Sequence, residues 1–443
     1  MDKKDILDLV KERNVVFIRL QFTDILGIPK NVEIPSSELE NALYNGILFD
    51  GSSIEGFVRI QESDMMLYPD PNTFTILPWT IDGGVVGRLI CDVLNPDGTP
   101  FLGDPRYILK RELKKLKDEF GYILNAGPEA EFFLFKKDST GKPTTITHDH
   151  GSYFDLLPID LGEKVREEIV TTLKEMGFEV ETAHHEVAEG QHEIDFRYSE
   201  ALRTADNVIT FKLVTKTIAL KYGLHATFMP KPVYGINGSG MHTHLSLFEG
   251  GENIFYDKNG KFELSNEALY FIGGILKHAK GICFITNPLI NSYKRIVPGY
   301  EAPVYISWAL RNRSALIRVP SAIGKARRIE FRSPDPSCNP YLAFSVILAA
   351  GIDGIKNKID PGEPTNIDIY NLTDEERKKI GIESLPGSLM EAKEEFLKDK
   401  VLTNALSDHI IEKLVESKDE EWDSFRTQVT NWELDRYLEI YWC

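Results

Sequence analysis

The stretch from Ala126 to Phe135, AGPEAEFFLF, constrains the fold of this chain more than any other. Its apolar residues predict a β-strand from Glu129 to Phe135, in which side chains alternate between two faces. Glu129 and Glu131 then share one face of an otherwise apolar strand. Carboxylates are costly to bury unless a cation or strong hydrogen-bond donors meet them. The pair therefore indicates either a solvated strand end or a metal site with oxygen ligands, which Mg²⁺ and Mn²⁺ prefer.

The same alternation of apolar and polar side chains recurs in later segments. Their polar faces are rich in Glu, His and Arg, whereas a solvated sheet face would favour Lys, Thr and Gln. We therefore expect a sheet curved around a polar pocket, with helices packed on its apolar back. The residues expected to share such faces are Glu193, Asp195 and Arg197; His242, His244 and Ser246; and Arg328, Glu330 and Arg332.

Carboxylates, imidazoles and arginines in one pocket indicate a particular chemistry. Four or more carboxylates and a histidine suit two or more divalent cations. Arginines bind phosphate and carboxylate groups through paired donors. Together these groups are typical of phosphoryl transfer. A lone histidine is usually structural, but two histidines and a serine that follow a glycine-rich turn are less easily explained in that way.

The first hundred residues alternate short helices and strands, which predicts a small α+β unit. Its unusual segment is Phe49–Phe57, FDGSSIEGF. This segment is either an ordinary turn or a loop that presents Asp50 as an exposed catalytic carboxylate. The run 95–105 is rich in Pro and Gly. We place a domain boundary there, between residues 1–103 and 104–443.

Composition excludes several classes of partner. The formal net charge is −17, which argues against nucleic acid. The four cysteines form no CxxC pair and fit reduced thiols in a cytoplasmic protein. The N-terminus is charged and amphipathic, unlike a signal peptide. No apolar run is expected to reach the length of a membrane span, so we predict no membrane partner.

Seven motifs, in order along the whole chain, resemble those of type I glutamine synthetases. The closest resemblance is to the short alpha subtype, which is not adenylylated. It implies an α+β fold with a small N-terminal β-grasp-like domain and a large C-terminal catalytic domain, whose curved antiparallel sheet is backed by helices. The motifs are FDGSSIEGF, GPEAEFFLF, HHEVAEGQHE, NGSGMHTHLS, VPGYEAP, RNRSALIRVP and KARRIEFRSPDPSCNPY.

The resemblance implies an activity and its partners. The expected reaction joins ammonia to L-glutamate, with ATP as co-substrate, through γ-glutamyl phosphate, and gives L-glutamine, ADP and phosphate. Two or three Mg²⁺ or Mn²⁺ ions per active site, a homo-dodecamer of two stacked hexameric rings and nitrogen-regulatory proteins are the expected partners. A γ-glutamyl-amine ligase of the same fold and a non-catalytic regulatory relative stay open as alternatives.

The resemblance also assigns roles to residues. One metal falls to Glu131, Glu186 and Glu193, and the other to Glu129, His242 and Glu330. Glutamate is expected at Glu131, Asn237, Gly238, Arg295, Glu301 and Arg332. ATP is expected at Glu181, Tyr198, His244, Ser246, Arg313, Lys325 and Arg328. The residues expected to act in catalysis are Asp50, which takes a proton from ammonium, Glu301, which closes the site, and Arg313, which neutralises the transferring phosphoryl group.

Arg59 is the expected regulatory residue. On composition alone it is a surface arginine that follows the Asp50 loop. In the alpha subtype that this chain resembles, an arginine at this position helps the product glutamine to hold an inactive arrangement. We therefore expect that Arg59→Ala keeps substantial synthesis but loses much of its inhibition by glutamine, as an inhibition curve at fixed glutamate would measure.

Overall fold

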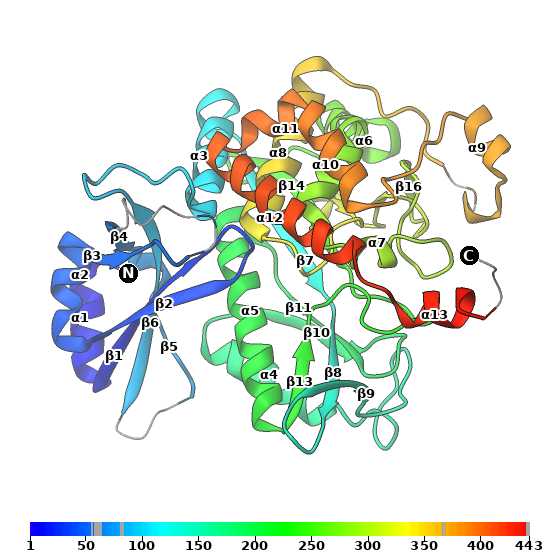
Figure 1. The fold of residues 1–443 in the computed structure, drawn as a ribbon. Coiled ribbons are helices and arrows are strands. Elements are labelled where there is room, and N and C mark those ends of the chain that lie inside the picture. The colour runs from blue at the N-terminus through cyan, green and yellow to red at the C-terminus, as the bar shows by residue number, and fades with distance from the viewer. Residues whose placement is uncertain (55, 57–63, 80–83, 366, 368, 440–443) are drawn as a thin grey trace.

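The N-terminal part of the chain folds into a six-stranded mixed sheet with two helices (Figure 1). The computed structural model describes residues 1–443 except 55, 57–63, 80–83, 366, 368 and 440–443. The strand order is β2-β1-β6-β4-β3, with β5 also paired to β6. The β1–β6 pair is parallel and the other pairs are antiparallel. The elements are α1 (Lys3–Glu12), β1 (Val15–Thr23), β2 (Pro29–Pro35), α2 (Leu39–Asn45), β3 (Ile47–Asp50), β4 (Asp64–Pro69), β5 (Thr75–Ile76) and β6 (Val85–Leu94).

The rest of the chain builds two further sheets. A five-stranded sheet has the order β10-β11-β8-β13 with β9 paired to β8, and a seven-stranded sheet has the order β12-β7-β14-β18-β17-β16 with β15 paired to β14. All pairs are antiparallel except β16–β17. The strands are β7 (Ile123–Ala130), β8 (Phe132–Lys137), β9 (Pro143–Thr147), β10 (Val180–His185), β11 (Gln191–Phe196), β12 (Ser199–Glu200), β13 (Leu224–Thr227), β14 (Met241–Glu249), β15 (Glu252–Asn253), β16 (Trp308–Leu310), β17 (Ile317–Val319) and β18 (Ile329–Phe331).

The expected single strand from Glu129 to Phe135 is wrong. Strand β7 ends at Ala130 and β8 begins at Phe132, so Glu131 lies between two strands of different sheets. The Glu131 backbone N–H donates to the Gly240 carbonyl at 3.0 Å, and its carboxylate accepts from the Gly240 N–H at 2.9 Å. This exchange of bonds with a distant loop turns the chain from one sheet into the next. Glu129 therefore belongs to the seven-stranded sheet, whereas Glu131 lies at the junction of the two sheets.

Helices pack against both sheets (Figure 1), and the buried apolar side chains of helices and strands form one core. Helix α5 packs on β7 and β13, while α6 and α8 pack on each other. The α-helices of this part are α3 (Pro105–Phe120), α4 (Glu163–Glu175), α5 (Ala201–Lys221), α6 (Asn266–Thr286), α7 (Ser292–Arg295), α8 (Pro340–Asn357), α9 (Asp374–Lys379), α10 (Leu389–Lys398), α11 (Lys400–Ala405), α12 (Asp408–Arg426) and α13 (Asn431–Tyr437). Short 3-10 helices span Ser36–Glu38, Pro71–Thr73, Lys261–Glu263, Gly324–Ala326 and Ile369–Asn371.

Helix α6 corrects one expectation from composition. It is long and apolar enough to cross a membrane, although no apolar run was expected to reach that length. Most of the helix is buried inside the protein. Gly274 of α6 lies so close to α8 that a Cβ there would approach the Ala350 carbonyl oxygen to 2.1 Å. Close packing between two core helices therefore explains the apolar sequence.

A buried arginine joins the N-terminal sheet to the rest of the chain. Arg106, on α3, is almost fully buried. It bonds Asp70 at 2.8 Å and Asp92 at 2.6 Å on the N-terminal side, and Asp206 of α5 at 2.9 Å. A buried cation needs such carboxylate partners. The interdomain joint is thus specified by charge as well as by apolar packing, while the boundary at residues 103 and 104 stays a prediction.

Candidate active site

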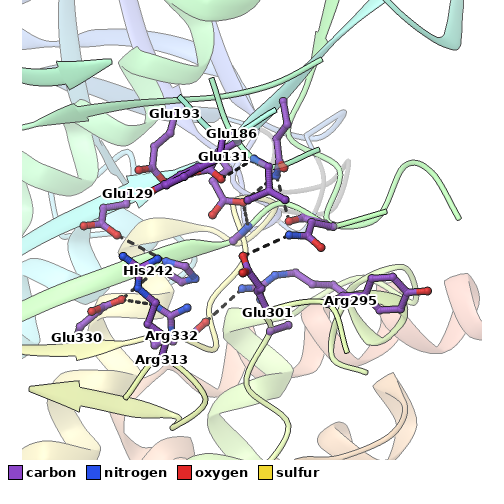
Figure 2. A pocket seen from close by; sticks show the side chains of 18 of the residues that line it. Glu129, Glu131, Glu186, Glu193, His242, Arg295, Glu301, Arg313, Glu330 and Arg332 are labelled. Carbon is purple, nitrogen blue, oxygen red and sulfur yellow. Dashed lines mark hydrogen bonds and ion pairs between the residues drawn. The ribbon is translucent and has the colours of Figure 1, made fainter. Parts of the chain in front are cut away.

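A polar cavity of about 740 Å³ lies where the two larger sheets meet (Figure 2). Its walls come from β7, β11, β14 and β18 and from loops near residues 237, 300 and 313. Every residue that was expected to hold a metal or glutamate lines this cavity, and so does Arg313. These residues are Glu129, Glu131, Glu186, Glu193, Asn237, Gly238, His242, Arg295, Glu301, Arg313, Glu330 and Arg332.

The first acidic triad consists of Glu131, Glu186 and Glu193. Glu131 lies at the junction of the sheets, Glu186 directly follows β10, and Glu193 is on β11. One carboxylate oxygen of each lies within 4.8 Å of the others. Burial and the charge of Glu186 raise the pKa of Glu131 to about 8, and burial with neighbouring carboxylates raises that of Glu193 well above its ordinary value. Buried carboxylates that repel one another fit a divalent cation, which would offset their charge.

The second triad consists of Glu129, His242 and Glu330, which also have ligand atoms within 4.8 Å of one another. Glu129 lies directly opposite His242 in the β7–β14 register, so the sheet itself brings them together. Burial lowers the pKa of His242 to about 4, helped by the charge of Arg332. The imidazole is therefore neutral at neutral pH and has a lone pair for a metal, as a ligand needs.

The carboxylates of the second triad already have cationic or hydrogen-bonding partners. Glu330 is fully buried, and Arg332 bonds it at 2.6 Å while Arg318 bonds its other oxygen. Burial would raise the pKa of Glu330, but the positive charge of Arg332 beside it holds that pKa below its usual range. The same balance of burial against bonds from two histidines lowers the pKa of Glu129.

His244 orients Glu129 from behind. The Arg328 Nε–H donates to His244 Nδ1 at 3.1 Å, so His244 carries its proton on Nε2. That Nε2–H donates to Glu129 Oε1 at 2.6 Å. The chain of bonds fixes both the tautomer of His244 and the rotamer of Glu129.

Two buried arginines, Arg295 and Arg332, line the cavity. Arg295 donates to the carbonyl oxygens of Ser333 at 2.9 Å and Arg332 at 3.3 Å. Arg332 is also buried, and among the described residues its Nε has no hydrogen-bond partner. Two such cations suit a small carboxylate. Glu301 lies across the cavity with a positive φ of 56°, and Asn237 donates to it at 3.3 Å.

A second cavity of about 380 Å³ adjoins the first and shares Glu129 and Asp195 with it. It contains the positions that were expected to contact ATP, except Arg313, which faces the first cavity. The structure brings together Glu181, Tyr198, His244, Ser246, Lys325 and Arg328 here. Their role as nucleotide contacts stays a prediction.

Asp50 does not reach either cavity. It is exposed at the end of β3, the edge strand of the N-terminal sheet, and its carboxylate accepts from the Ser52 N–H at 2.8 Å. It is absent from the lining of both cavities. Arg59 falls outside the residues that the structure describes.

Several cavity residues were not assigned a role from sequence. Asp195 shares a strand face with Glu193, and that alternation could have identified it; burial and the charge of Glu129 raise its pKa to about 6. His184 lies opposite Glu193 in the β10–β11 register. Tyr153 packs its ring against His184 with centroids 5.6 Å apart, and it comes from an irregular loop without any periodic signal. Tyr370 also lines the cavity.

Comparison with protein families covers nearly the whole chain. The family described as "Glutamine synthetase, catalytic domain" matches residues 102–437, and "Glutamine synthetase, beta-Grasp domain" matches residues 14–96. The chain belongs to the glutamine synthetase family. A curated glutamine synthetase from Thermotoga maritima is 59% identical over 98% of both chains, and one from Thermus thermophilus is 58% identical over 99% of both.

Solved structures confirm the expected fold class. A structure of GmaS with ADP matches with a TM-score of 0.89 and 34% identity, covering 98% of this chain and 99% of that one. The glutamine synthetase of Plasmodium falciparum matches with a TM-score of 0.88 and 28% identity over 99% of both chains. The small β-grasp domain and the large catalytic domain are thus those of the family.

Proposed function

We propose that this protein joins ammonia to the γ-carboxylate of L-glutamate and uses ATP to make L-glutamine, ADP and phosphate. The observation that carries the proposal is one cavity that holds two ligand triads beside two buried arginines, Arg295 and Arg332. Full-length relatives at 58–59% identity that are named glutamine synthetase support it.

In the first step the γ-carboxylate attacks the terminal phosphoryl group of ATP. A carboxylate oxygen is a poor leaving group, so γ-glutamyl phosphate has to form before ammonia can displace phosphate. Arg295 and Arg332 would hold glutamate, with Asn237 and Gly238 at its amino-acid end. Arg313 would spread the charge of the transferring group. Mg²⁺ or Mn²⁺ ions, two or three per site, would be held by the two triads and would offset the charge of the phosphates.

In the second step ammonia attacks the acyl phosphate. Ammonium carries no lone pair, so a base has to take its proton first. We assign that role to Asp50 of a neighbouring copy, because the exposed edge of β3 carries Asp50 away from both cavities of its own chain. Glu301 would close the site over the intermediate and keep water out. This arrangement requires an oligomer, for which we propose a dodecamer of two stacked hexameric rings.

The setting and control of the enzyme are further parts of the proposal. We place it in the cytoplasm, with nitrogen-regulatory proteins as candidate partners. Regulation would follow the subtype without adenylylation. In that subtype Arg59 would couple glutamine binding to the Asp50 loop, as an inhibition curve of Arg59→Ala would test.

The test is an assay of phosphate release and of glutamine formation, with each component omitted in turn. We expect both products only when glutamate, ammonium, ATP and Mg²⁺ are present together. Replacing ammonium by methylamine or ethylamine distinguishes glutamine synthesis from the amine-ligase alternative. Faster turnover with an amine than with ammonium would replace the proposed substrate. Phosphate release without any need for glutamate would overturn the reaction itself.

A further inference from the structure

Five of the ten histidines lie between residues 148 and 192, and three of them are buried behind the first triad. The turn between β10 and β11 carries Glu186 at its start, and Glu193 follows on β11. The position of this turn therefore decides how two of the three carboxylates of the triad face each other. Glu186 N–H donates to the Gln191 carbonyl at 2.8 Å, which closes the turn, and the Leu134 N–H of β8 donates to the Gly190 carbonyl at 2.9 Å.

Asp149 ties both ends of this turn to the loop that follows β9. This aspartate is only 3% exposed and comes from the loop that follows β9. Its Oδ1 accepts from the Gly190 N–H at 2.9 Å and from His185 Nε2–H at 3.2 Å, one bond at each end of the turn. Its Oδ2 accepts from the Leu161 N–H at 3.2 Å and lies 3.0 Å from His148 Nε2. One carboxylate thus connects the turn to two loops behind it.

His185 continues the connection to the triad itself. Its Nδ1–H donates to the Glu186 carbonyl oxygen at 2.6 Å, while its Nε2–H donates to Asp149. The His185 carbonyl in turn accepts from the Phe154 N–H at 3.1 Å, next to the cavity residue Tyr153. The path from Asp149 to the backbone of Glu186 therefore runs through a single buried side chain.

We propose that Asp149 is a positioning residue for the first metal site, an inference that rests on the metal-dependent function proposed above. It holds the β10–β11 turn at both ends, and through His185 it fixes the backbone of Glu186. Groups that orient metal ligands from behind commonly change metal affinity by about 10- to 100-fold when they are replaced.

The cluster itself is not a second metal site, although groups of its ligand atoms lie close together. The Arg166 Nη1–H donates to His192 Nδ1 at 2.9 Å, so His192 carries its proton on Nε2 and has no lone pair to offer there. Both nitrogens of His185 face acceptors, and both therefore carry protons. Arg166 also brings a positive charge, paired with Asp160 at 2.6 Å. The protons on His185 and His192 and the positive charge of Arg166 therefore disfavour a metal cation in this cluster.

The test is Asp149→Asn, measured by Mn²⁺ titration of the full chain without glutamate, ammonium or ATP. An amide keeps the size of the side chain but presents an NH₂ group to the donors on one side and loses the charge. The titration uses a Glu129→Gln background, which weakens the second triad so that the first dominates the isotherm. Calorimetry and the electron paramagnetic resonance signal of free Mn²⁺ give the affinity, and thermal unfolding gives the stability.

Two matched aspartates provide the controls. Asp160→Asn breaks the Arg166 pair in the same buried cluster, and among the described residues its hydrogen bonds reach Arg166 and Gly162 but not the turn. Asp138→Asn removes a carboxylate that caps another turn, with bonds to the Thr140 and Lys142 N–H groups. His185→Gln is the second probe of the same path and keeps the proposal testable where Asp149→Asn does not fold.

We expect Asp149→Asn and His185→Gln to weaken Mn²⁺ binding by about tenfold or more. Asp160→Asn should lower thermal stability and leave Mn²⁺ affinity near that of the background, and Asp138→Asn should change neither. Equal Mn²⁺ affinity in Asp149→Asn and the background, or an equal loss in Asp160→Asn, would overturn the positioning role alone. Absence of Mn²⁺ binding by the unmodified chain would overturn the metal sites of the proposed function, and the positioning role with them.

Discussion

The two acidic triads of the cavity stand on different sheets and differ in how their charge is balanced. Glu193 is on the five-stranded sheet, Glu186 directly follows its strand β10 and Glu131 directly precedes its strand β8, and the pKa values of Glu131 and Glu193 are raised. Glu129, His242 and Glu330 belong to the seven-stranded sheet, and the pKa values of their carboxylates are lowered. Arg332 and Arg318 bond Glu330 directly and His244 bonds Glu129, whereas Glu186 and Glu193 of the first triad share one histidine, His184, at 3.1 and 3.7 Å.

The two triads therefore differ in what offsets their negative charge. The first triad needs an external cation before its carboxylates can all be ionised. The carboxylates of the second triad are ionised without a cation, and its neutral histidine, His242, has a lone pair for a metal. Stability and metal dependence should therefore respond in opposite ways when each triad loses a carboxylate.

The largest effect is expected from Glu330→Gln. The change leaves Arg332 and Arg318 beside a neutral group in a buried site, and breaking a buried ion pair in this way costs about 3 to 5 kcal/mol. Chemical unfolding of the metal-free protein would measure the loss. Unchanged stability would mean that the two arginines do not compensate Glu330, and the contrast between the triads would fail.

Asp50→Asn tests whether the two triads and their cavity make up a whole site within one chain. We expect glutamine formation to fall by about 10²-fold or more, as for a missing proton acceptor, while Mn²⁺ binding stays normal. Mixed oligomers of Asp50→Asn and Glu131→Gln subunits should recover activity if Asp50 acts on a neighbour. Failure of these mixed oligomers to exceed either parent would place Asp50 outside the reaction or within its own chain.

Glu131→Gln tests how the first triad affects stability with and without a bound metal. Removing one of three mutually repelling carboxylates should leave the metal-free protein as stable as before, or more stable. In the unmodified chain, free metal at about 100 times its Kd adds about 2.7 kcal/mol per site. We expect thermal unfolding with and without Mg²⁺ to show much of this gain lost in Glu131→Gln. A full metal-induced shift in the variant would remove Glu131 from the ligands.

The smallest effect is expected at His278, whose bound proton offsets the negative charge of two neighbouring aspartates. His278 is buried between Asp399 at 2.5 Å and Asp353 at 2.9 Å. Burial opposes the charge, but bonds to both aspartates raise the pKa of His278 above 6.5. Its contribution is then fully present below pH 6.5 and is lost as pH rises through the raised pKa.

Thermal unfolding across that pH range would measure this contribution. Facing groups are Asp353, Asp399 and Lys277, which also bonds Asp353 at 3.0 Å. His278→Gln should remove the slope while leaving Mn²⁺ affinity unchanged. The same slope in the variant would assign the pH dependence to other groups.

Strand alternation predicted many of the side chains that face the two cavities, because that property is local. It was wrong for Arg197, because β11 ends at Phe196 and Arg197 is exposed and pairs with Glu179 at 2.8 Å. His242 and Glu330 were placed correctly on polar strand faces by alternation alone, and the structure adds that His242 lies opposite Glu129. The family resemblance then grouped these faces into triads whose members the structure brings together. Their roles stay predictions, but their common location needed nothing beyond sequence.

Features that depend on distant parts of the chain could not be predicted in this way. The break at Glu131 results from its bonds to Gly240, which is 109 residues away. Asp149 acts on Gly190, 41 residues away, from a loop without periodic pattern. Its sequence neighbours are polar and look like any surface loop, so burial is the only sign of its importance, and burial appears only in the folded chain.

The single residue between β7 and β8 has a geometric consequence. The second triad lies on the seven-stranded sheet and the first lies at the five-stranded sheet and its junction, and the chain passes from one sheet to the other at Glu131. The distance between two ions held by the two triads would therefore depend on the angle between the two sheets. Substitutions of residues that pack against the Glu131 junction would change that distance without replacing any metal ligand.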